Sequence, residues 1–413
     1  MDKILSKYLS SLLLASFLVL ASFPAFAEVE KDWTVLVYLN GNNNLDEFGF
    51  LNMNQMEQVG SNDRINIVVQ WASLRNGKTQ RVLVKSDTNT SEVTSPVIED
   101  MGKVDMGDSN NLLNFMLWGF KNYPAKHYLV DVWNHGSGWR RMKMMNFSAG
   151  QSFFPTDISF DDNTGNSIST KQLGEVMDQA ARSLGRKIDL YASDACLMGM
   201  AEIANELSDS VVTFAGSEEV EAAAGWPYHT ILKRLAENPE SNSVDFAKIL
   251  TEEFVRFYNG GGDNRQDATF SSFDLSQMGV LNQSMAELSR VLSLVKSAEK
   301  AKVMQAARNT QRFAFSDYAD LLDFLNQLES QKLTSVPTKT IQGVKEALKS
   351  FVLTNSATAS HPRAYGTAFW LPTSSYVYDR YASKYSTLRF HQETKWGDTL
   401  KILLKPKNSE DRH

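Results

Sequence analysis

The sequence predicts an α/β protein with a largely parallel central sheet, helices on both faces of that sheet, and a mainly helical C-terminal region. Between residues 33 and 215, short apolar runs alternate with segments whose apolar residues recur every three or four positions. Such alternation is typical of β-α-β units, whose parallel strands are buried on both faces. Helical spacing then dominates from about residue 229. We therefore divide the mature chain into a sheet-based core, 28–230, and a mainly helical region, 231–413, with a late strand near 366–371.

Each predicted strand is a short apolar run bounded by turn residues or by a helical segment. The first run ends in the asparagine-rich stretch 40–44, which is typical of a turn. One alternating run, 269–274, lies within the helical region. The runs assigned to the core sheet are 33–39, 65–71, 80–85, 127–133, 187–192 and 211–215.

Helices are predicted between these strands from their apolar faces and their ends. One covers 45–59, and the next ends before Pro124. Another begins at a capping box, Ser169 with Gln172, and is followed by glycine. The last begins directly after Cys196. The apolar faces of the second and last helices are Leu113, Met116, Leu117 and Phe120, and Leu197, Met200, Ala201 and Ala204.

Residues 1–27 are predicted to be a signal peptide that is cleaved after Ala27. Lys3 and Lys7 precede an apolar run, and small residues stand at the cleavage site. The apolar run is shorter than the roughly 20 residues that span a bilayer. We expect a secreted or periplasmic protein without a stable membrane span.

The charge and the cysteine content limit the classes of function that the protein can have. The 42 basic and 48 acidic residues give a formal charge of −6, and no dense Lys/Arg run provides a surface for nucleic acid. The one cysteine, Cys196, has no partner for a disulfide within the chain. In an exported protein such a thiol is either a small buried hydrophobe or a reactive group.

Cys196 and His135 each follow a predicted parallel strand, and so they should meet at one edge of the sheet. A thiol reacts as the thiolate, and a nearby histidine or helix N-terminus lowers the thiol pKa. We expect the helix after Cys196 to direct its N–H groups at the sulfur. His135 would either form an ion pair with the thiolate or protonate a leaving amine.

Two neighbours complete the expected site. Gly136 leaves room for a substrate carbonyl, so the backbone N–H groups of Gly136 and Cys196 are candidates for an oxyanion hole. Asp194 stands two residues before Cys196 on a strand and should share its face. A carboxylate beside the nucleophile suits a cationic substrate side chain, namely Arg or Lys.

Four sequence blocks resemble the clostripain family of cysteine peptidases, which have the caspase-like fold. Their order and spacing match the family as well as their residues do. The resemblance covers about residues 32–230 well and continues loosely to Pro372. The blocks are Asp32-Trp-Thr-Val-Leu-Val-Tyr-Leu-Asn-Gly-Asn-Asn-Asn-Leu45, Asn134-His-Gly-Ser-Gly-Trp139, Asp194-Ala-Cys-Leu-Met-Gly199 and Gly225-Trp-Pro-Tyr228.

The resemblance implies roles for individual residues. His135 and Cys196 would form the catalytic dyad, and Asp194 would form the base of the S1 pocket. The family cleaves proteins and peptides after Arg or Lys. Several members cut themselves in the loop after the catalytic histidine. The matching basic residues here are Arg140, Arg141 and Lys143.

The wall of the S1 pocket departs from the family pattern. The family tends to have a proline before the Gly-Trp pair, where this chain has 221–225, Glu-Ala-Ala-Ala-Gly. Glu219 or Glu221 would supply a second carboxylate, and Trp226 is a further substrate-binding candidate.

Calcium is used by characterised relatives. Asp161-Asp162-Asn163 could supply oxygen ligands for it. A run of this kind is more often simply a turn, which we favour.

Two other functions compete with the peptidase. A serine esterase is faintly suggested by 135–138, His-Gly-Ser-Gly, but the chain lacks the expected G-x-S-x-G elbow. A catalytically silent secreted binding protein would keep the scaffold without the chemistry. Thiol-alkylating reagents should inactivate only the cysteine peptidase.

Overall fold

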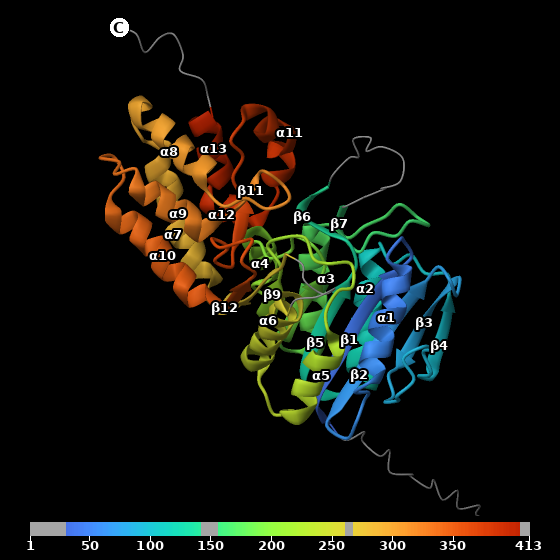
Figure 1. Cartoon of the computed structure of the whole chain (residues 1–413). Helices are drawn as coiled ribbons and strands as arrows, with labels where there is room; N and C mark the ends of the chain where they lie inside the picture. Colours follow the sequence, from blue (N-terminus) through green and yellow to red (C-terminus); the bar gives the residue numbers. More distant parts are fainter. Residues whose placement is uncertain (1–29, 142–155, 261–266, 405–413) are drawn as a thin grey trace, which may run out of the picture.

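The computed structural model describes residues 30–141, 156–260 and 267–404, so the predicted signal peptide lies outside the described residues. Among the described residues, nine strands form one central sheet (Figure 1). In spatial order they are β12 (Val352–Ala357), β10 (Thr269–Asp274), β9 (Val211–Gly216), β8 (Ile188–Asp194), β5 (Ala125–Trp133), β1 (Lys31–Gly41), β2 (Ile65–Ser73), β3 (Lys78–Leu83) and β4 (Val97–Gly102).

The middle of this sheet is parallel and its edges are antiparallel. Strands β9, β8, β5, β1 and β2 pair in parallel. The outer strands β10, β12, β3 and β4 pair antiparallel. The predicted parallel core is confirmed, whereas β4 and β12 were not predicted. Most β4 side chains are exposed, so β4 lacks the apolar signal of a buried strand.

Helices cover both faces of the sheet, as predicted. Alternate side chains of β1 point to opposite faces: Leu36 and Tyr38 join one hydrophobic cluster, and Val35 and Val37 join the other. The first cluster takes residues from α2 (Ser109–Asn122), α3 (Thr170–Leu184) and α4 (Ala201–Leu207). The second takes residues from α1 (Asp46–Glu57), α5 (Tyr228–Glu237) and α6 (Ser243–Asn259).

Helix ends follow the sequence signals closely at α3 and poorly at α4. Ser169 and Gln172 form the predicted capping box, and Gly185 ends α3 in the left-handed conformation with φ 75°. Helix α4, by contrast, begins at Ala201 and not directly after Cys196. Leu197 has φ 63°, so the chain makes a turn before the helix starts.

The C-terminal region is mainly helical, as predicted, and packs against the same hydrophobic cluster as α2, α3 and α4 (Figure 1). A two-stranded sheet in this region joins β11 (Tyr318–Asp320) to β13 (Ala368–Trp370). A second two-stranded sheet, in the core, joins β6 (Gly136–Arg141) to β7 (Thr156–Ile158). Its helices are α7 (Met278–Ser293), α8 (Ser297–Asn309), α9 (Leu321–Ser330), α10 (Thr338–Phe351), α11 (Ser375–Tyr385), α12 (Arg389–Thr394) and α13 (Trp396–Leu404).

The predicted boundary at residue 230 does not separate two independent units. It falls inside α5, and α5 and α6 cover the core sheet. Strands β10 and β12, which lie beyond the boundary, extend that sheet from β9. Within the ranges that the structure describes, no helix combines the length and apolarity needed to cross a membrane.

We expect Leu36→Ala to lower the free energy of unfolding by about 2–5 kcal/mol, because Leu36 is fully buried between β1 and α2. Leu51→Ala is the matched control, since Leu51 is 42% exposed, and it should change stability by about 0.5 kcal/mol or less. Denaturant midpoints measure both. Equal losses in the two variants would contradict the assigned core.

Candidate active site

The pairing of β5 with β8 brings the two predicted catalytic residues to one edge of the sheet. Trp133 lies opposite Asp194 in the parallel register. The N–H of Asn134 donates to the Asp194 carbonyl at 3.1 Å, which holds the two strand ends together. His135 and Cys196 each stand two residues beyond this matched pair. The prediction that they share the carboxyl edge is therefore confirmed.

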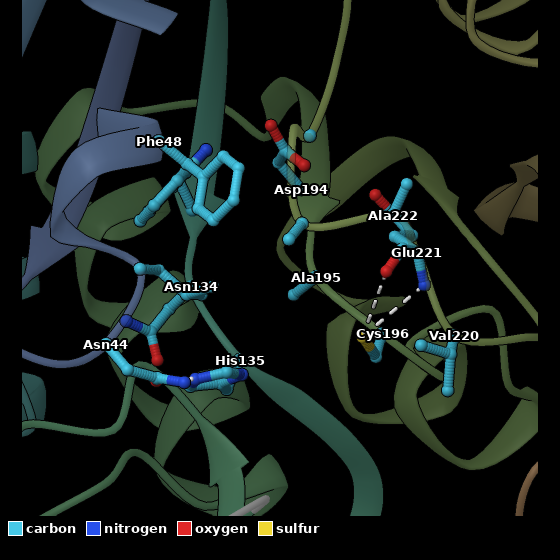
Figure 2. A pocket seen from close by; sticks show the side chains of 14 residues that line it. Asn44, Phe48, Asn134, His135, Asp194, Ala195, Cys196, Val220, Glu221 and Ala222 are labelled. Atoms are coloured by element: carbon cyan, nitrogen blue, oxygen red, sulfur yellow. Dashed lines mark hydrogen bonds between the residues drawn. The ribbon is translucent and has the colours of Figure 1, made fainter. Parts of the chain in front are cut away.

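Both residues line one cavity of about 180 Å³. Figure 2 shows His135 and Asn44 on one side of it and Cys196 with Glu221 on the other. Phe48, Val220 and three alanines give much of the wall an apolar character, and Asp194 contributes a carboxyl group. The lining residues are Asn44, Leu45, Phe48, Trp133, Asn134, His135, Asp194, Ala195, Cys196, Val220, Glu221, Ala222, Ala223 and Gly225.

Cys196 lies on a tight turn that is tied to the loop after β9. The N–H of Leu197 donates to the Glu219 carbonyl at 3.1 Å, and the N–H of Gly199 donates to the Ser217 carbonyl at 2.7 Å. The Glu221 N–H approaches the Cys196 Sγ at 3.4 Å. Because α4 begins only at Ala201, the expected stabilisation of a thiolate by a helix N-terminus is wrong.

Burial gives the two predicted catalytic groups pKa values that favour their neutral forms. It raises the pKa of the Cys196 thiol to about 11, and nearby Glu219 and Asp194 act in the same direction. Burial also lowers the pKa of the His135 imidazole to about 4. Near neutral pH the resting pair is therefore a thiol and an uncharged imidazole. Of the two roles left open for His135, this state favours proton transfer during the reaction over a standing ion pair.

Asn44 was missed by the sequence analysis as a site residue. Its Oδ1 lies 2.8 Å from the Nε2 of His135. With Nε2–H donating to this oxygen, an uncharged imidazole keeps its lone pair on Nδ1. The sequence feature that could have identified Asn44 is the position of the asparagine-rich stretch, which follows β1 directly at the carboxyl edge of the sheet.

Gly136 lies against the backbone of Cys196. A β-carbon at Gly136 would lie 2.4 Å from the Cys196 carbonyl oxygen and 3.2 Å from the Cys196 nitrogen. Only glycine permits this approach of the loops that carry His135 and Cys196. The oxyanion role of the Gly136 and Cys196 N–H groups stays a prediction.

Asp194 belongs to a buried group of acids. The Tyr228 hydroxyl lies 2.6 Å from Asp131 Oδ2 and 3.0 Å from Asp194 Oδ2, and the Trp226 N–H donates to Asp194 at 3.1 Å. Burial raises the pKa of Asp194 to about 7 and that of Asp131 well above its usual range. The single hydroxyl hydrogen of Tyr228 cannot serve two carboxylates fully, so a proton shared by the acids fits the geometry.

Glu221 is the third acid of this group. It is 7% exposed, and its carboxyl oxygens receive no hydrogen bond from a donor in the described ranges. Burial and the charge of Asp194 raise its pKa well above the usual range. No lysine or arginine of the described residues forms an ion pair with Asp131, Asp194 or Glu221. Asp194 and Glu221 line the cavity, and Asp131 lies behind them at hydrogen-bond distance from the same tyrosine as Asp194.

Two predicted substrate-binding residues lie outside the cavity wall. Glu219 accepts hydrogen bonds from the N–H groups of Val220 and Ala314 and lies 3.1 Å from His361 Nε2. The Trp226 indole is 1% exposed and packs beside Tyr228, so only its backbone N–H serves the site. Glu221, the other candidate for the second carboxylate, is the one that lines the cavity.

Arg140 is a poor self-cleavage site, contrary to expectation. It is 6% exposed, and its guanidinium lies 2.7 Å from Asp317. A peptidase cannot extend a peptide around a residue that is held this way in the folded chain. Arg141 ends β6, and its side chain and all of Lys143 lie outside the described residues.

The run Asp161-Asp162-Asn163 fits a turn better than a calcium site. Asp161 accepts hydrogen bonds from Asn42, from the Met106 N–H and from the Asn163 N–H. Its oxygens are thus engaged with donors, which a calcium ion would have to displace. In the parts of the chain that the structure describes, no cluster of three or more His, Cys, Asp or Glu residues is arranged to hold a metal. Calcium use stays a prediction.

Comparison with known proteins identifies the family. A model of the clostripain family matches residues 37–402. The chain belongs to the clostripain family. Clostripain from Hathewaya histolytica is 28% identical over 236 residues, which make up 51% of this chain and 44% of clostripain. The matched part therefore spans less than half the length of that relative.

Solved structures agree with the clostripain-family assignment at the level of the fold. One is an inactive zymogen of a protease from Parabacteroides distasonis, with a TM-score of 0.66 and 16% identity over 89% of this chain and 99% of that one. Another is a secreted cysteine protease from Bacteroides thetaiotaomicron bound to an irreversible peptide inhibitor, with a TM-score of 0.64 and 19% identity over 90% and 99%. The predicted caspase-like fold is confirmed, as is membership of a family of cysteine peptidases.

We expect the alkylation of Cys196 by iodoacetamide to rise about tenfold per pH unit from pH 6 to 9, because the reactive thiolate is scarce until the pH approaches the thiol pKa of about 11. The Cys196→Ala variant is the control for labelling elsewhere. Mass spectrometry measures the rate. A rate that is already constant by pH 7 would mean a standing thiolate and contradict the neutral pair.

Proposed function

We propose that this chain is a secreted cysteine endopeptidase that cleaves peptide bonds after Arg or Lys. One observation carries the proposal: a partly buried thiol, an imidazole and two acids that have no basic partner among the described residues all line the same cavity. The family supports the peptidase chemistry. The predicted signal peptide supports secretion.

The proposed reaction begins when Nδ1 of His135 takes the thiol proton as Cys196 Sγ attacks the scissile carbonyl carbon. The Nε2–H of His135 donates to Asn44 Oδ1, and the imidazole would lose this hydrogen bond if it turned Nε2 toward the thiol. The N–H groups of Gly136 and Cys196 then stabilise the oxyanion. His135 gives the proton to the leaving amine, and water hydrolyses the remaining thioester to release the acid and restore the thiol.

The S1 pocket is proposed to bind the basic side chain through charge. The apolar wall formed by Phe48, Val220 and Ala222 would contact the aliphatic stem of Arg or Lys. Asp194 and Glu221 would then meet the cationic head. A cation stabilises the ionised form of both acids, so binding should lower their pKa values and release the shared proton.

We expect Cys196→Ala to abolish cleavage of fluorogenic peptides ending in Arg or Lys, because it removes the nucleophile. Asp194→Asn should lower kcat/KM for these peptides about a hundredfold, since a buried charge pair is lost, and should change cleavage after neutral residues little. Peptides ending in Arg, Lys, Asp and Leu, assayed with and without a calcium chelator, measure both effects.

These assays also separate the competing functions. An unchanged preference in Asp194→Asn would remove Asp194 from the S1 pocket. Activity that survives Cys196→Ala in a clean preparation would contradict the cysteine mechanism. If the wild type cleaves no peptide even after trypsin has cut the 140–143 stretch, the chain is a binding protein on a peptidase scaffold.

We also propose that the enzyme cuts itself after Arg141 or Lys143, because both match its proposed specificity and follow the catalytic histidine. The double variant Arg141→Gln, Lys143→Gln should stay intact when the wild type yields two fragments. Intact-mass spectrometry identifies the cut. Equal fragmentation of Cys196→Ala would show that another protease makes it.

A further inference from the structure

We propose that residues 313–320, called the strap, position the two loops that carry His135 and Cys196. The C-terminal region would then contribute to catalysis by holding the active site in place. The inference rests on the proposed peptidase function and deepens it. One short segment reaches the strand after His135 on one side and the loop behind Cys196 on the other.

On the histidine side, the strap bonds to β6, which begins at Gly136. The Tyr318 hydroxyl donates to the Ser137 carbonyl at 2.8 Å. A β-carbon at Gly138, which has φ 66°, would lie 2.7 Å from the Tyr318 ring. The contact thus depends on the absence of a side chain at Gly138, two residues from Gly136. It fixes the position of β6 relative to the strap.

Arg140 fastens the same strand to the strap by charge. Asp317 accepts from the Arg140 guanidinium at 2.7 Å and from the Trp370 indole at 2.9 Å. The guanidinium also lies over the Phe315 ring at 4.3 Å and the Tyr381 ring at 4.7 Å. A buried cation with an acid and aromatic faces around it is held in one place. The basic residue predicted as a cleavage site is therefore an anchor.

On the cysteine side, the strap acts through Glu219. The Ala314 N–H donates to Glu219 Oε1 at 3.1 Å, and His361 Nε2 lies 3.1 Å from Oε2. The backbone carbonyl of Glu219 in turn accepts from Leu197 at 3.1 Å. Leu197 follows the nucleophile and has φ 63°, a conformation that costs a non-glycine residue about 1–2 kcal/mol. The turn that presents Cys196 therefore needs an outside restraint, which Glu219 supplies.

These contacts differ from ordinary packing between two regions of a protein. They are directional hydrogen bonds, one to the backbone of β6 after His135 and one to the Glu219 side chain, whose own backbone carbonyl holds the turn after Cys196. The relative position of these two loops decides whether the imidazole meets the thiol. Misplacing a catalytic group by about 1 Å can cost on the order of a hundredfold in rate. The strap is thus a positioning element, and Glu219 is a positioning residue that is not part of the cavity wall.

Two substitutions test the strap with little change in shape. Tyr318→Phe removes one hydroxyl and keeps the ring, and Glu219→Ala removes the acceptor of the Ala314 N–H. Thr399→Val is the matched control, because the buried Thr399 hydroxyl also donates to a backbone carbonyl, that of Ser289, at 2.9 Å, in the C-terminal region and outside the strap. Glu219→Gln keeps the acceptor oxygen and removes the charge.

We expect Tyr318→Phe and Glu219→Ala to lower kcat about tenfold with KM nearly unchanged, while Thr399→Val stays within about twofold of wild type and Glu219→Gln recovers most of the kcat that Glu219→Ala loses. The double variant Tyr318→Phe, Glu219→Ala should lose less than the product of the single losses, because either substitution loosens the same unit. Tyr318→Phe and Thr399→Val should show similar losses in Tm.

Two results would overturn the strap: kcat losses that match those of Thr399→Val, or failure of Glu219→Gln to restore kcat. If wild type cleaves no basic peptide, the proposed function fails. The effect of the strap on Cys196 is then measured as the rate of alkylation of this thiol at pH 9. Tyr318→Phe should change that rate at least threefold relative to Thr399→Val. Equal rates would overturn the strap in that case.

Discussion

The burial of three acids that have no basic partner in the described part of the chain is the constraint on which the proposed site depends. Asp131, Asp194 and Glu221 gather where β5 and β8 end, and a single tyrosine hydroxyl serves two of them. Buried carboxylates without a cation are costly unless they take up protons. The raised pKa values of these acids reflect that cost. A substrate cation would offset this cost, and under the proposed function the cavity therefore binds the side chain of Arg or Lys.

The same burial sets the protonation state of the proposed catalytic pair, Cys196 and His135. Exclusion of water raises the pKa of the Cys196 thiol and lowers that of the His135 imidazole, so both groups rest uncharged. Negative charge on Asp194 acts against a thiolate as well. A basic substrate side chain would offset that charge as it binds. Under the proposed function, substrate selection and activation of the nucleophile are therefore linked through one cluster of charges.

The sequence predicted the parts of the site that depend on local spacing. Strands rich in apolar residues, and the positions of His135 and Cys196 after two of them, followed from periodicity and from the rule for parallel sheets. The start of α4 could not be predicted, because Leu197 and Met200 are buried by a turn and not by a helix. The burial of Arg140 could not be predicted for another reason: its acid and aromatic partners come from residue 315 and beyond, far along the chain. Pairing at that distance leaves no local pattern.

The most direct test of the charge account is a calorimetric titration of Cys196→Ala at pH 6 with two peptides, one ending in Arg and one ending in citrulline, the neutral isostere. Measuring each in buffers of different ionisation enthalpy gives the protons exchanged on binding. The account predicts tighter binding of the Arg peptide together with release of a proton, because the cation ionises the shared acids. Equal affinities, or binding of Arg without proton release, would contradict it.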